Sequence, residues 1–402
     1  MSQSFSIAFH RREFLVRSLG AAGCAAAAAA PAGGIATAWA GGTDAVRVGV
    51  VGCGGRGTGA AIQAAAADPG VRIVALGDLF GDQIESSSAM LRHALAGRFD
   101  WSRTRRHVGP DAYLGVLAAP VDLVILAAPP HALARHLAAA VDAGVHAYCE
   151  APVAIDTAGV HVAEAAVERA RAHGLSIGAG LCFRHDAATR NAIDAIRAGS
   201  LGRIEGARVE ARIGLPWRRP TAGCGAAEAR DRNWVSFAAL SGGPFVEHHV
   251  HAIDKALWAL GDDLPVTAEG RILAGRDEPD AVGDGHTGVA VRYTLADGRA
   301  IEAVCHRRSG LADGIHEDVR GTAGRASLPR QTSSTGPDRF AAAMAHLVHG
   351  IRSGRQVDEG GRLCTSTLTA VMGRMAAETG RRVAWCDVTP PRLASPIQSA
   401  RA

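Results

Sequence analysis

The stretch that decides the fold is Val46-Arg47-Val48-Gly49-Val50-Val51-Gly52-Cys53-Gly54-Gly55-Arg56-Gly57. Its first six residues are mostly apolar and β-branched, a pattern typical of a strand that is buried on both faces. Glycines with the spacing G-x-G-x-x-G follow at positions 52, 54 and 57, and the alanine-rich segment 60–67 predicts a helix. A strand, a glycine-rich turn and a helix in this order predict a dinucleotide-binding unit.

An acidic residue in the expected place strengthens this prediction. A second apolar segment, Val71 to Leu76, leads to Asp78, about 20 residues beyond the last glycine of the turn. We expect Gly52 to allow the tight turn, Gly54 to let the backbone approach the pyrophosphate, and Gly57 to permit close helix–strand packing. Asp78 is expected to bind the adenosine ribose and to repel a 2′-phosphate, which favours NAD over NADP.

Further strands and helices alternate as far as residue 183. Segment 121–128 predicts a strand, segment 132–143 a helix, and segment 176–182 a last buried strand. This alternation predicts an α/β fold with a doubly wound parallel sheet, which we place at residues 44–183. Ligands bind beyond the carboxyl ends of such strands. The predicted cofactor residues are therefore Gly52, Gly54, Gly55, Arg56, Gly57, Asp78, Pro129, Pro130, His131 and Glu150.

Beyond residue 183 the apolar residues begin to alternate with polar ones. Segment 207–213 alternates in this way, which indicates a strand with one solvated face. Segments 289–295 and 299–306 flank Ala296-Asp297-Gly298 and predict a hairpin, and segment 319–328 predicts another. Helices are predicted at 245–260, 338–352 and 363–379. We expect an open, mainly antiparallel sheet in a substrate and oligomerisation domain at residues 184–388, followed by a tail at 389–402.

The N-terminal sequence predicts a signal peptide for export. Arg11-Arg12-Glu13-Phe14-Leu15 precedes an apolar stretch of small residues that ends at Ala38-Trp39-Ala40. Paired arginines, a short apolar region and a small-x-small site are typical of a twin-arginine signal peptide. We therefore expect residues 1–40 to be removed and the protein to be periplasmic.

Composition excludes several classes of protein. The 402 residues are 48% hydrophobic and 20% charged, which is enough apolar material for two packed domains. A formal net charge of +4 without a basic block argues against a nucleic-acid or membrane-surface partner, and the apolar stretches are too interrupted to span a bilayer. The eight cysteines are scattered without a C-x-x-C pair, so neither a zinc framework nor a disulfide pattern is predicted. Cys149, Cys182 and Cys305 lie in apolar runs and are expected to be buried.

The order of these motifs resembles the glucose–fructose oxidoreductase, inositol dehydrogenase and MocA family. The resemblance rests on the glycine fingerprint, Asp78, Pro129-Pro130-His131, Cys149-Glu150-x-Pro152 and Gly199-Ser200-Leu201-Gly202-Arg203-Ile204. Segment 366–374 also resembles a late helix of secreted members. The resemblance implies an NAD(P)-dependent oxidoreductase acting on a hydroxyl or carbonyl of a sugar, polyol or related compound. It also implies a dimer or tetramer formed through the open sheet, and export implies a tightly bound cofactor.

The catalytic residues are expected on the helix that follows Gly242-Gly243. A helix over this segment places Glu247, His251 and Asp254 on one face. Alcohol oxidation needs a base for the hydroxyl proton, and His251 has a suitable ordinary pKa and matches the family's H-x-x-D histidine. Glu247 is expected to orient His251 or to hold a substrate hydroxyl. The histidines at 248, 249 and 251 leave a metal site as an alternative, but the resemblance implies no metal.

One departure from the family pattern puts the chemistry in question. The pattern Glu-Lys-Pro, whose lysine contacts the reacting hydroxyl, reads Glu150-Ala151-Pro152 here. Loss of a general acid–base group typically costs about 10²–10⁴-fold in rate. Lys255, the only lysine in the chain, is within reach of the site but is expected to face solvent. Two alternatives therefore stay open: an NAD-using sugar hydrolase or isomerase without net redox, and a catalytically impaired sugar-binding member.

Substrate residues are the least defined by the sequence. Trp217 and Trp234 bracket a variable loop that offers either a sugar-stacking surface or core packing. Arg184 follows the last parallel strand and either lines the pocket or pairs with an acid. The predicted substrate residues are Arg184, Trp234 and Asp254.

Overall fold

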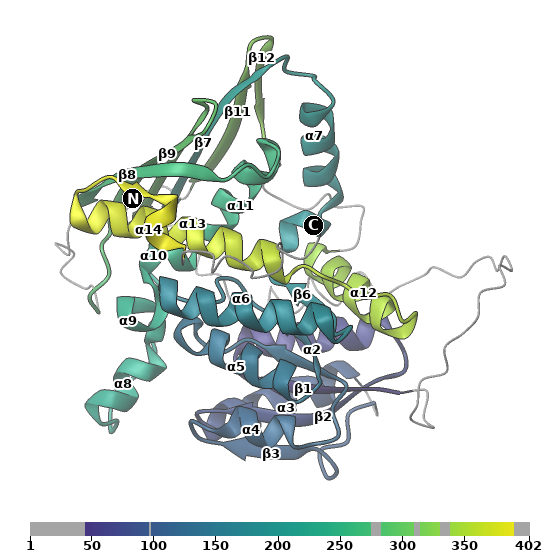
Figure 1. Ribbon diagram of the computed structural model, residues 1–402. Helices are drawn as coiled ribbons and strands as arrows, with labels where there is room; N and C mark the ends of the chain where they lie inside the picture. The colour runs from purple at the N-terminus through teal and green to yellow at the C-terminus, as the bar shows by residue number, and fades with distance from the viewer. Residues whose placement is uncertain (1–44, 96–97, 275–282, 309–313, 330–337, 390–402) are drawn as a thin grey trace, which may run out of the picture.

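The computed structural model describes residues 45–95, 98–274, 283–308, 314–329 and 338–389 (Figure 1). The predicted export signal at residues 1–40 lies outside the described residues, and so does the predicted tail apart from residue 389. None of the described helices is both long enough and apolar enough to cross a membrane.

The first sheet has six strands, all parallel, in the order β3-β2-β1-β4-β5-β6. The strands are β1 (Val46–Val51), β2 (Val71–Asp78), β3 (Arg105–Val108), β4 (Leu123–Leu126), β5 (His146–Cys149) and β6 (Ile177–Ala179). The predicted doubly wound parallel sheet is confirmed. The strand order reverses between β1 and β4, and a crevice for ligands forms beyond the carboxyl ends of strands at such a point.

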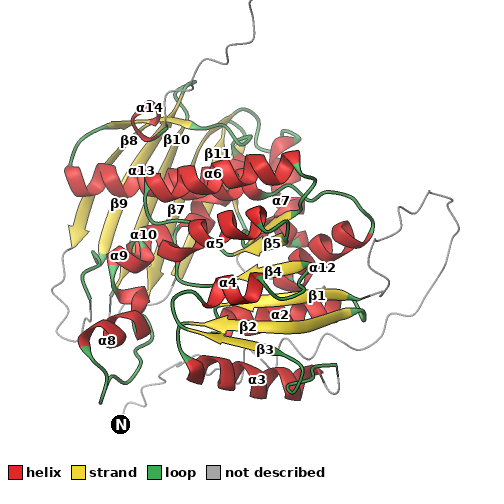
Figure 2. Cartoon of the chain, turned by 60° about the horizontal axis from the view of Figure 1, so that its bottom comes forward, coloured by secondary structure: helices red, strands yellow, loops and turns green. Residues whose placement is uncertain are grey.

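Helices cover both faces of this sheet (Figure 2). They are α2 (Gly55–Ala67), α3 (Gly81–Leu95), α4 (Ala112–Leu117), α5 (Pro130–Asp142) and α6 (Thr157–Ala172). A late helix, α12 (Arg339–Arg352), packs on α2 and buries Met344 and Leu347 in the same apolar cluster as Val48 of β1. A segment expected in the second domain therefore completes one face of the nucleotide-binding sheet.

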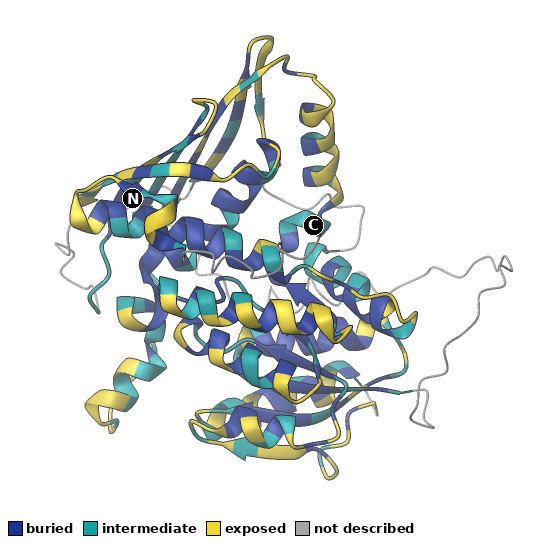
Figure 3. Ribbon diagram, viewed as in Figure 1, coloured by how far each residue is buried: buried dark blue, intermediate teal, exposed yellow. Residues whose placement is uncertain are grey.

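The second sheet has seven strands in the order β12-β11-β7-β10-β9-β8-β13. The strands are β7 (Ile204–Ile213), β8 (Pro265–Ala274), β9 (Gly288–Leu295), β10 (Ala300–Arg307), β11 (Gly314–Gly321), β12 (Gly324–Ser327) and β13 (Val383–Ala384). Both predicted hairpins form, and every pairing except that of β7 with β10 is antiparallel. Buried and exposed residues alternate along these strands (Figure 3), so one face of the sheet is solvated.

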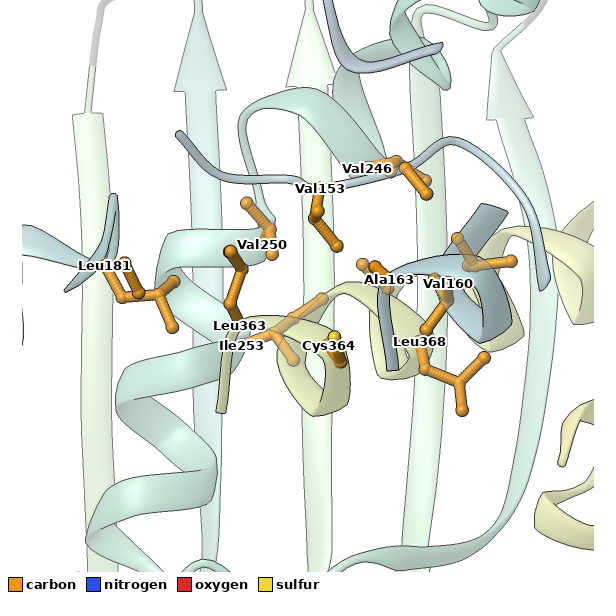
Figure 4. Packing of buried hydrophobic residues seen from close by; sticks show 14 of the residues in the cluster. Val153, Val160, Ala163, Leu181, Val246, Val250, Ile253, Leu363, Cys364 and Leu368 are labelled. Atoms are coloured by element: carbon orange, nitrogen blue, oxygen red, sulfur yellow. The ribbon is translucent and has the colours of Figure 1, made fainter. Parts of the chain in front are cut away.

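A long helix joins the two sheets into one apolar core. Helix α13 (Gly360–Thr379) contacts β8 and β9 on one side and α6 on the other. Figure 4 shows its Leu363 and Leu368 among Val153, Val160 and Ile253. Other helical elements are η1 (Cys182–His185), α7 (Ala187–Arg197), α8 (Ala226–Arg232), η2 (Trp234–Ser236), α9 (Ala238–Ser241) and α14 (Trp385–Val388).

The helix predicted at 245–260 is divided into two. Helix α10 (Gly243–Glu247) ends before His248, and α11 begins after His249 and runs over Val250–Ala259. The backbone N–H groups of His248 and His249 both donate to the carbonyl of Pro244, at 3.1 and 3.2 Å. This turn places the ring of His249 in the core, 5.3 Å from the ring of Phe245. The prediction of one continuous helix was wrong because it took no account of this buried aromatic pair.

Candidate active site

The glycine turn between β1 and α2 has one closed side and one open side. Gly52 adopts φ +90°, and a Cβ there would lie 2.5 Å from the carbonyl of Ala127. A Cβ on Gly57 would lie 1.9 Å from the carbonyl oxygen of Gly52, so only glycine lets the helix lie this close to the strand. A Cβ on Gly54 or Gly55 would meet no protein atom within 4 Å. The open side therefore has room for a ligand to approach the backbone.

The start of α2 suits an anion. Gly54 is its N-cap residue, no side chain caps the helix, and its first turn contains no acidic residue. The free N–H groups and the helix dipole at such an end favour a phosphate group. The residues present thus fit the diphosphate of a dinucleotide.

Asp78 lies directly against this turn, at the carboxyl end of β2. Its carboxylate accepts hydrogen bonds from the backbone N–H groups of Cys53, at 2.7 Å, and Phe80, at 2.9 Å. Burial raises the pKa of Asp78 above its ordinary value, although these two hydrogen bonds oppose the shift. The carboxylate is thereby fixed beside the turn, where an adenosine ribose would lie.

Arg56 is partly buried and paired with an acidic residue. Its guanidinium forms an ion pair with Glu150, which follows β5, and lies 4.4 Å from the centre of the Phe340 ring on α12. Gly180 packs tightly against Glu150, because a Cβ there would lie 2.4 Å from the carboxylate. The pair thus joins the glycine turn to the end of β5.

The predicted residues after β4 also lie at this edge of the sheet. Pro129 and Pro130 form the N-cap and first position of α5, where proline's fixed φ fits the helix. The Nδ1 atom of His131 lies 3.3 Å from the carbonyl oxygen of Leu240 on α9, and burial lowers its pKa. The peptide bond between Ala151 and Pro152 is cis.

His251 lies in the first turn of α11 and is half-buried. Its Nδ1 atom is buried and has no hydrogen-bond partner among the described residues. Its ring meets the ring of Phe183 edge-on, with 6.3 Å between their centres. Burial, followed by the positive charges of neighbouring side chains, lowers the pKa of His251 to about 3. The imidazole is therefore neutral at physiological pH, but it is a weaker base than the ordinary histidine pKa led us to expect.

Glu247 does not lie on the same helix as His251, contrary to the prediction, whereas Asp254 follows His251 by three residues on α11. The break between α10 and α11 turns Glu247 toward Arg307 of β10, whose Nη2 lies 3.1 Å from its carboxylate. Asp254 is 1% exposed and accepts two-pronged hydrogen bonds from Arg184, at 2.9 and 3.0 Å, and one from Ser366, at 2.8 Å. This arrangement makes Asp254 and Arg184 a buried anchor between η1, α11 and α13.

The other predicted substrate residue lies in an aromatic pair. Trp234 of η2 meets Trp217 edge-on, with 6.2 Å between ring centres, and Trp217 is 48% exposed. Asn233 fixes the loop by accepting a 2.8 Å hydrogen bond from the backbone N–H of Arg219. The pair therefore presents an aromatic surface that is partly open to solvent.

We expected Lys255 to face solvent, but it is buried and only 1% exposed. It forms an ion pair with Glu317 of β11, and its Nζ lies 3.9 Å from the centre of the Phe183 ring. The expectation was wrong because η1 and β11 cover this side of α11. The sequence interpretation also did not identify Phe183, Glu317 and Arg339 as neighbours of this site. The one available signal was the spacing of four between His251 and Lys255, which places both residues on one helix face.

Cysteines and histidines supply no further site in the part of the chain that the structure describes. The seven described cysteines are free, and Cys149, Cys182 and Cys305 are buried, as predicted. No group of three or more His, Cys, Asp or Glu residues within the described ranges is arranged to hold a metal ion. His249 is fully buried, and burial lowers its pKa to about 3.

Comparison with known proteins gives a family match and a set of similar structures. Residues 46–181 match the model of the oxidoreductase family with an NAD-binding Rossmann fold, GFO_IDH_MocA. A scyllo-inositol dehydrogenase from Lactobacillus casei, solved with NAD(H) and scyllo-inositol, is 19% identical with a TM-score of 0.64, over 85% of this chain and 99% of that one. A myo-inositol 2-dehydrogenase from Lactobacillus plantarum is 20% identical with a TM-score of 0.64, over 85% and 99%. None of the curated proteins matches the chain.

A third similar structure is not an inositol dehydrogenase by its name. GenD2 from gentamicin A biosynthesis, solved in complex with NAD, is 19% identical with a TM-score of 0.64, over 87% of this chain and 99% of that one. At these identities the three structures establish the shared fold of both domains. The family match establishes residues 46–181 as an NAD-binding domain.

Proposed function

Because residues 46–181 belong to the oxidoreductase family with an NAD-binding Rossmann fold, we propose that this protein is an NAD-dependent enzyme that interconverts a hydroxyl and a carbonyl group on a sugar, inositol or related polyol. The observation that carries the proposal is the glycine turn, which is open at Gly54, lies against Asp78 and precedes an uncapped helix. Structural similarity to inositol dehydrogenases supports the substrate class.

Bound NAD supplies an acceptor for the hydride that leaves the substrate carbon. The N-terminus of α2 holds the diphosphate, and Asp78 accepts hydrogen bonds from the adenosine ribose. A 2′-phosphate would meet the carboxylate of Asp78, so NAD is preferred to NADP. Pro129, Pro130, His131 and Glu150 lie at the edge of the sheet where the nicotinamide end belongs.

His251 takes the hydroxyl proton of the substrate. The neutral imidazole accepts this proton while hydride leaves the same carbon, which becomes the carbonyl carbon. Glu247, held by Arg307, is placed to accept a hydrogen bond from another substrate hydroxyl. Trp234 offers a surface for a sugar ring, whereas the contacts of Asp254 and Arg184 support a structural role for those two residues.

Export and self-association complete the proposal. The paired arginines at 11 and 12 support export by the twin-arginine route, which carries folded proteins and so allows NAD to be bound before export. The open sheet supports a homodimer or tetramer. Its edge region near β8 exposes Leu264, Val266 and Leu273, which are 40%, 42% and 39% exposed.

The test is to incubate the purified protein with NAD and a panel of sugars, inositols and sugar alcohols while following the absorbance of reduced nicotinamide. Accumulation of reduced cofactor that is lost in H251Q supports the proposal. Release of an aglycone from a glycoside without such accumulation would support the redox-neutral alternative. Sugar binding with neither reaction would mark a catalytically impaired member. A wild-type protein that neither contains nor binds NAD would refute both NAD-using alternatives and leave only the sugar-binding member.

A further inference from the structure

Lys255 is unusual in this chain because every other basic residue among the 43 Lys and Arg is arginine. Arginine serves surface and buried ion pairs alike, and its guanidinium stays protonated in proteins. Lysine instead carries a compact ammonium whose pKa changes when it is buried. The single lysine is 1% exposed, whereas most of the arginines are solvated. At this buried position a lysine offers a compact, titratable ammonium, which a guanidinium does not.

The position of Lys255 connects it with the proposed catalytic histidine. Lys255 follows His251 by four residues on α11, so the two side chains lie on one face of the helix. Both side chains meet Phe183: the ammonium lies 3.9 Å from the ring centre, and the imidazole lies edge-on at 6.3 Å. Glu317 of β11 holds the ammonium in place through an ion pair.

The charged groups around this pair of residues come from several elements and are mainly positive. His251 is influenced by His248 before α11, by Lys255, by Arg339 of α12 and by Arg56 of α2. Lys255 is influenced by Glu317, Arg339 and Cys182. Burial lowers the pKa of Lys255 below its ordinary value of 10.5, and the Glu317 carboxylate opposes the shift. The ion pair with Glu317 places the ammonium of Lys255 on the histidine side of the site.

We propose that Lys255, held by Glu317, is a positioning residue that supplies, beside His251, the positive charge that Ala151 does not supply. The same charge attracts the negative charge that develops on the substrate oxygen as its proton leaves. The balance of the reaction is unchanged: the oxygen-bound proton passes to His251, and hydride passes from carbon to NAD. This inference rests on the proposed function.

The first test removes the Lys255–Glu317 pair and then introduces a lysine at position 151. In K255M/E317Q both charges are removed together, so neither remains buried and unpaired. We expect kcat with NAD and an accepted polyol to fall by about 10–100-fold, less than for loss of a direct acid–base group, while NAD affinity stays unchanged. Adding A151K should restore kcat at least tenfold, because it returns an ammonium to the reacting centre. The matched control is D318N, the next residue on β11, which is bonded to Ser327 and should leave kcat unchanged.

The second test needs no variant. Since Lys255 is the only lysine, protein labelled with ¹⁵N-lysine gives one side-chain signal that reports this residue directly. We expect it to titrate below 10.5 and to shift when NAD binds. Wild-type kcat in K255M/E317Q, failure of A151K to rescue a folded double variant, or a lysine that titrates normally and ignores NAD would each overturn the inference. In all three cases the proposed function stands as long as the wild type reduces NAD with a polyol.

Discussion

Alanine substitutions at Gly57 and Gly54 separate the two functions of the glycine turn. The Cβ of G57A would lie 1.9 Å from the carbonyl oxygen of Gly52, so the backbone must move to accommodate it. Overpacking typically costs about 1–3 kcal/mol, and this contact is with backbone, so we expect the free energy of unfolding without ligand to fall by about 2–3 kcal/mol. The Cβ of G54A meets no protein atom within 4 Å, so its unfolding free energy should change by less than about 0.5 kcal/mol.

NAD affinity should be reduced by G54A, the variant whose unfolding free energy is nearly unchanged. The methyl group of G54A would stand where the diphosphate approaches the backbone, so we expect NAD to bind at least about tenfold more weakly, equivalent to about 1.4 kcal/mol. Urea unfolding without ligand measures the first effect, and calorimetric titration with NAD measures the second. G225A is the matched control, since Gly225 also precedes a helix and its Cβ would meet no atom within 4 Å. Unchanged NAD affinity in G54A, or a G57A variant as stable as the wild type, would refute this account of the turn.

Four further predictions follow from the described contacts. D78N should weaken NAD binding by about 10–100-fold and narrow the preference over NADP, as fluorescence titration with both cofactors would measure; an unchanged preference would contradict the ribose role. H251Q should lower kcat by about 10²–10⁴-fold at unchanged NAD affinity, and equal turnover would exclude His251 as the base. Burial lowers the pKa of His136 to about 4 and of His249 to about 3. Below pH 6.5, the ordinary histidine pKa, the unfolded chain therefore binds more protons at these two residues than the folded protein does. The unfolding free energy should therefore decrease from pH 6.5 toward pH 4, by up to about 1.4 kcal/mol per unit for each histidine, and a flat urea-unfolding series would count against it. D254N should cost about 3–5 kcal/mol of stability because it leaves Arg184 without its main partner, while KM of the folded enzyme stays the same; a raised KM at full stability would favour a substrate contact.

The nucleotide-binding half was predictable because its signals are local. The β-branched run at 46–51, the glycine spacing and Asp78 lie within a short stretch, and each has one dominant physical reading. The structure places Gly57 against Gly52 and Asp78 against the turn, as that interpretation required. The hairpin around Ala296-Asp297-Gly298 was predictable for the same reason, because turn chemistry and alternation act over neighbouring residues.

The proposed catalytic centre was only partly predictable because it is assembled from distant segments. Helical spacing put Glu247, His251 and Asp254 on one face, but the helix is divided where His249 packs against Phe245, and Glu247 is on the other helix. The expectation for Lys255 failed because Phe183 and Glu317 come from other elements that the sequence did not assign to this helix. The packing of α12 on α2, which brings Arg339 and Phe340 to the site, gave no local signal either.

A crystal structure of the protein with bound NAD would test the central claim most directly. The account predicts the diphosphate on the backbone at Gly54, the adenosine ribose hydrogen-bonded to Asp78, and the nicotinamide ring and the His251 imidazole facing one shared cavity. A cofactor bound elsewhere, or an imidazole separated from the nicotinamide by intervening protein, would contradict it.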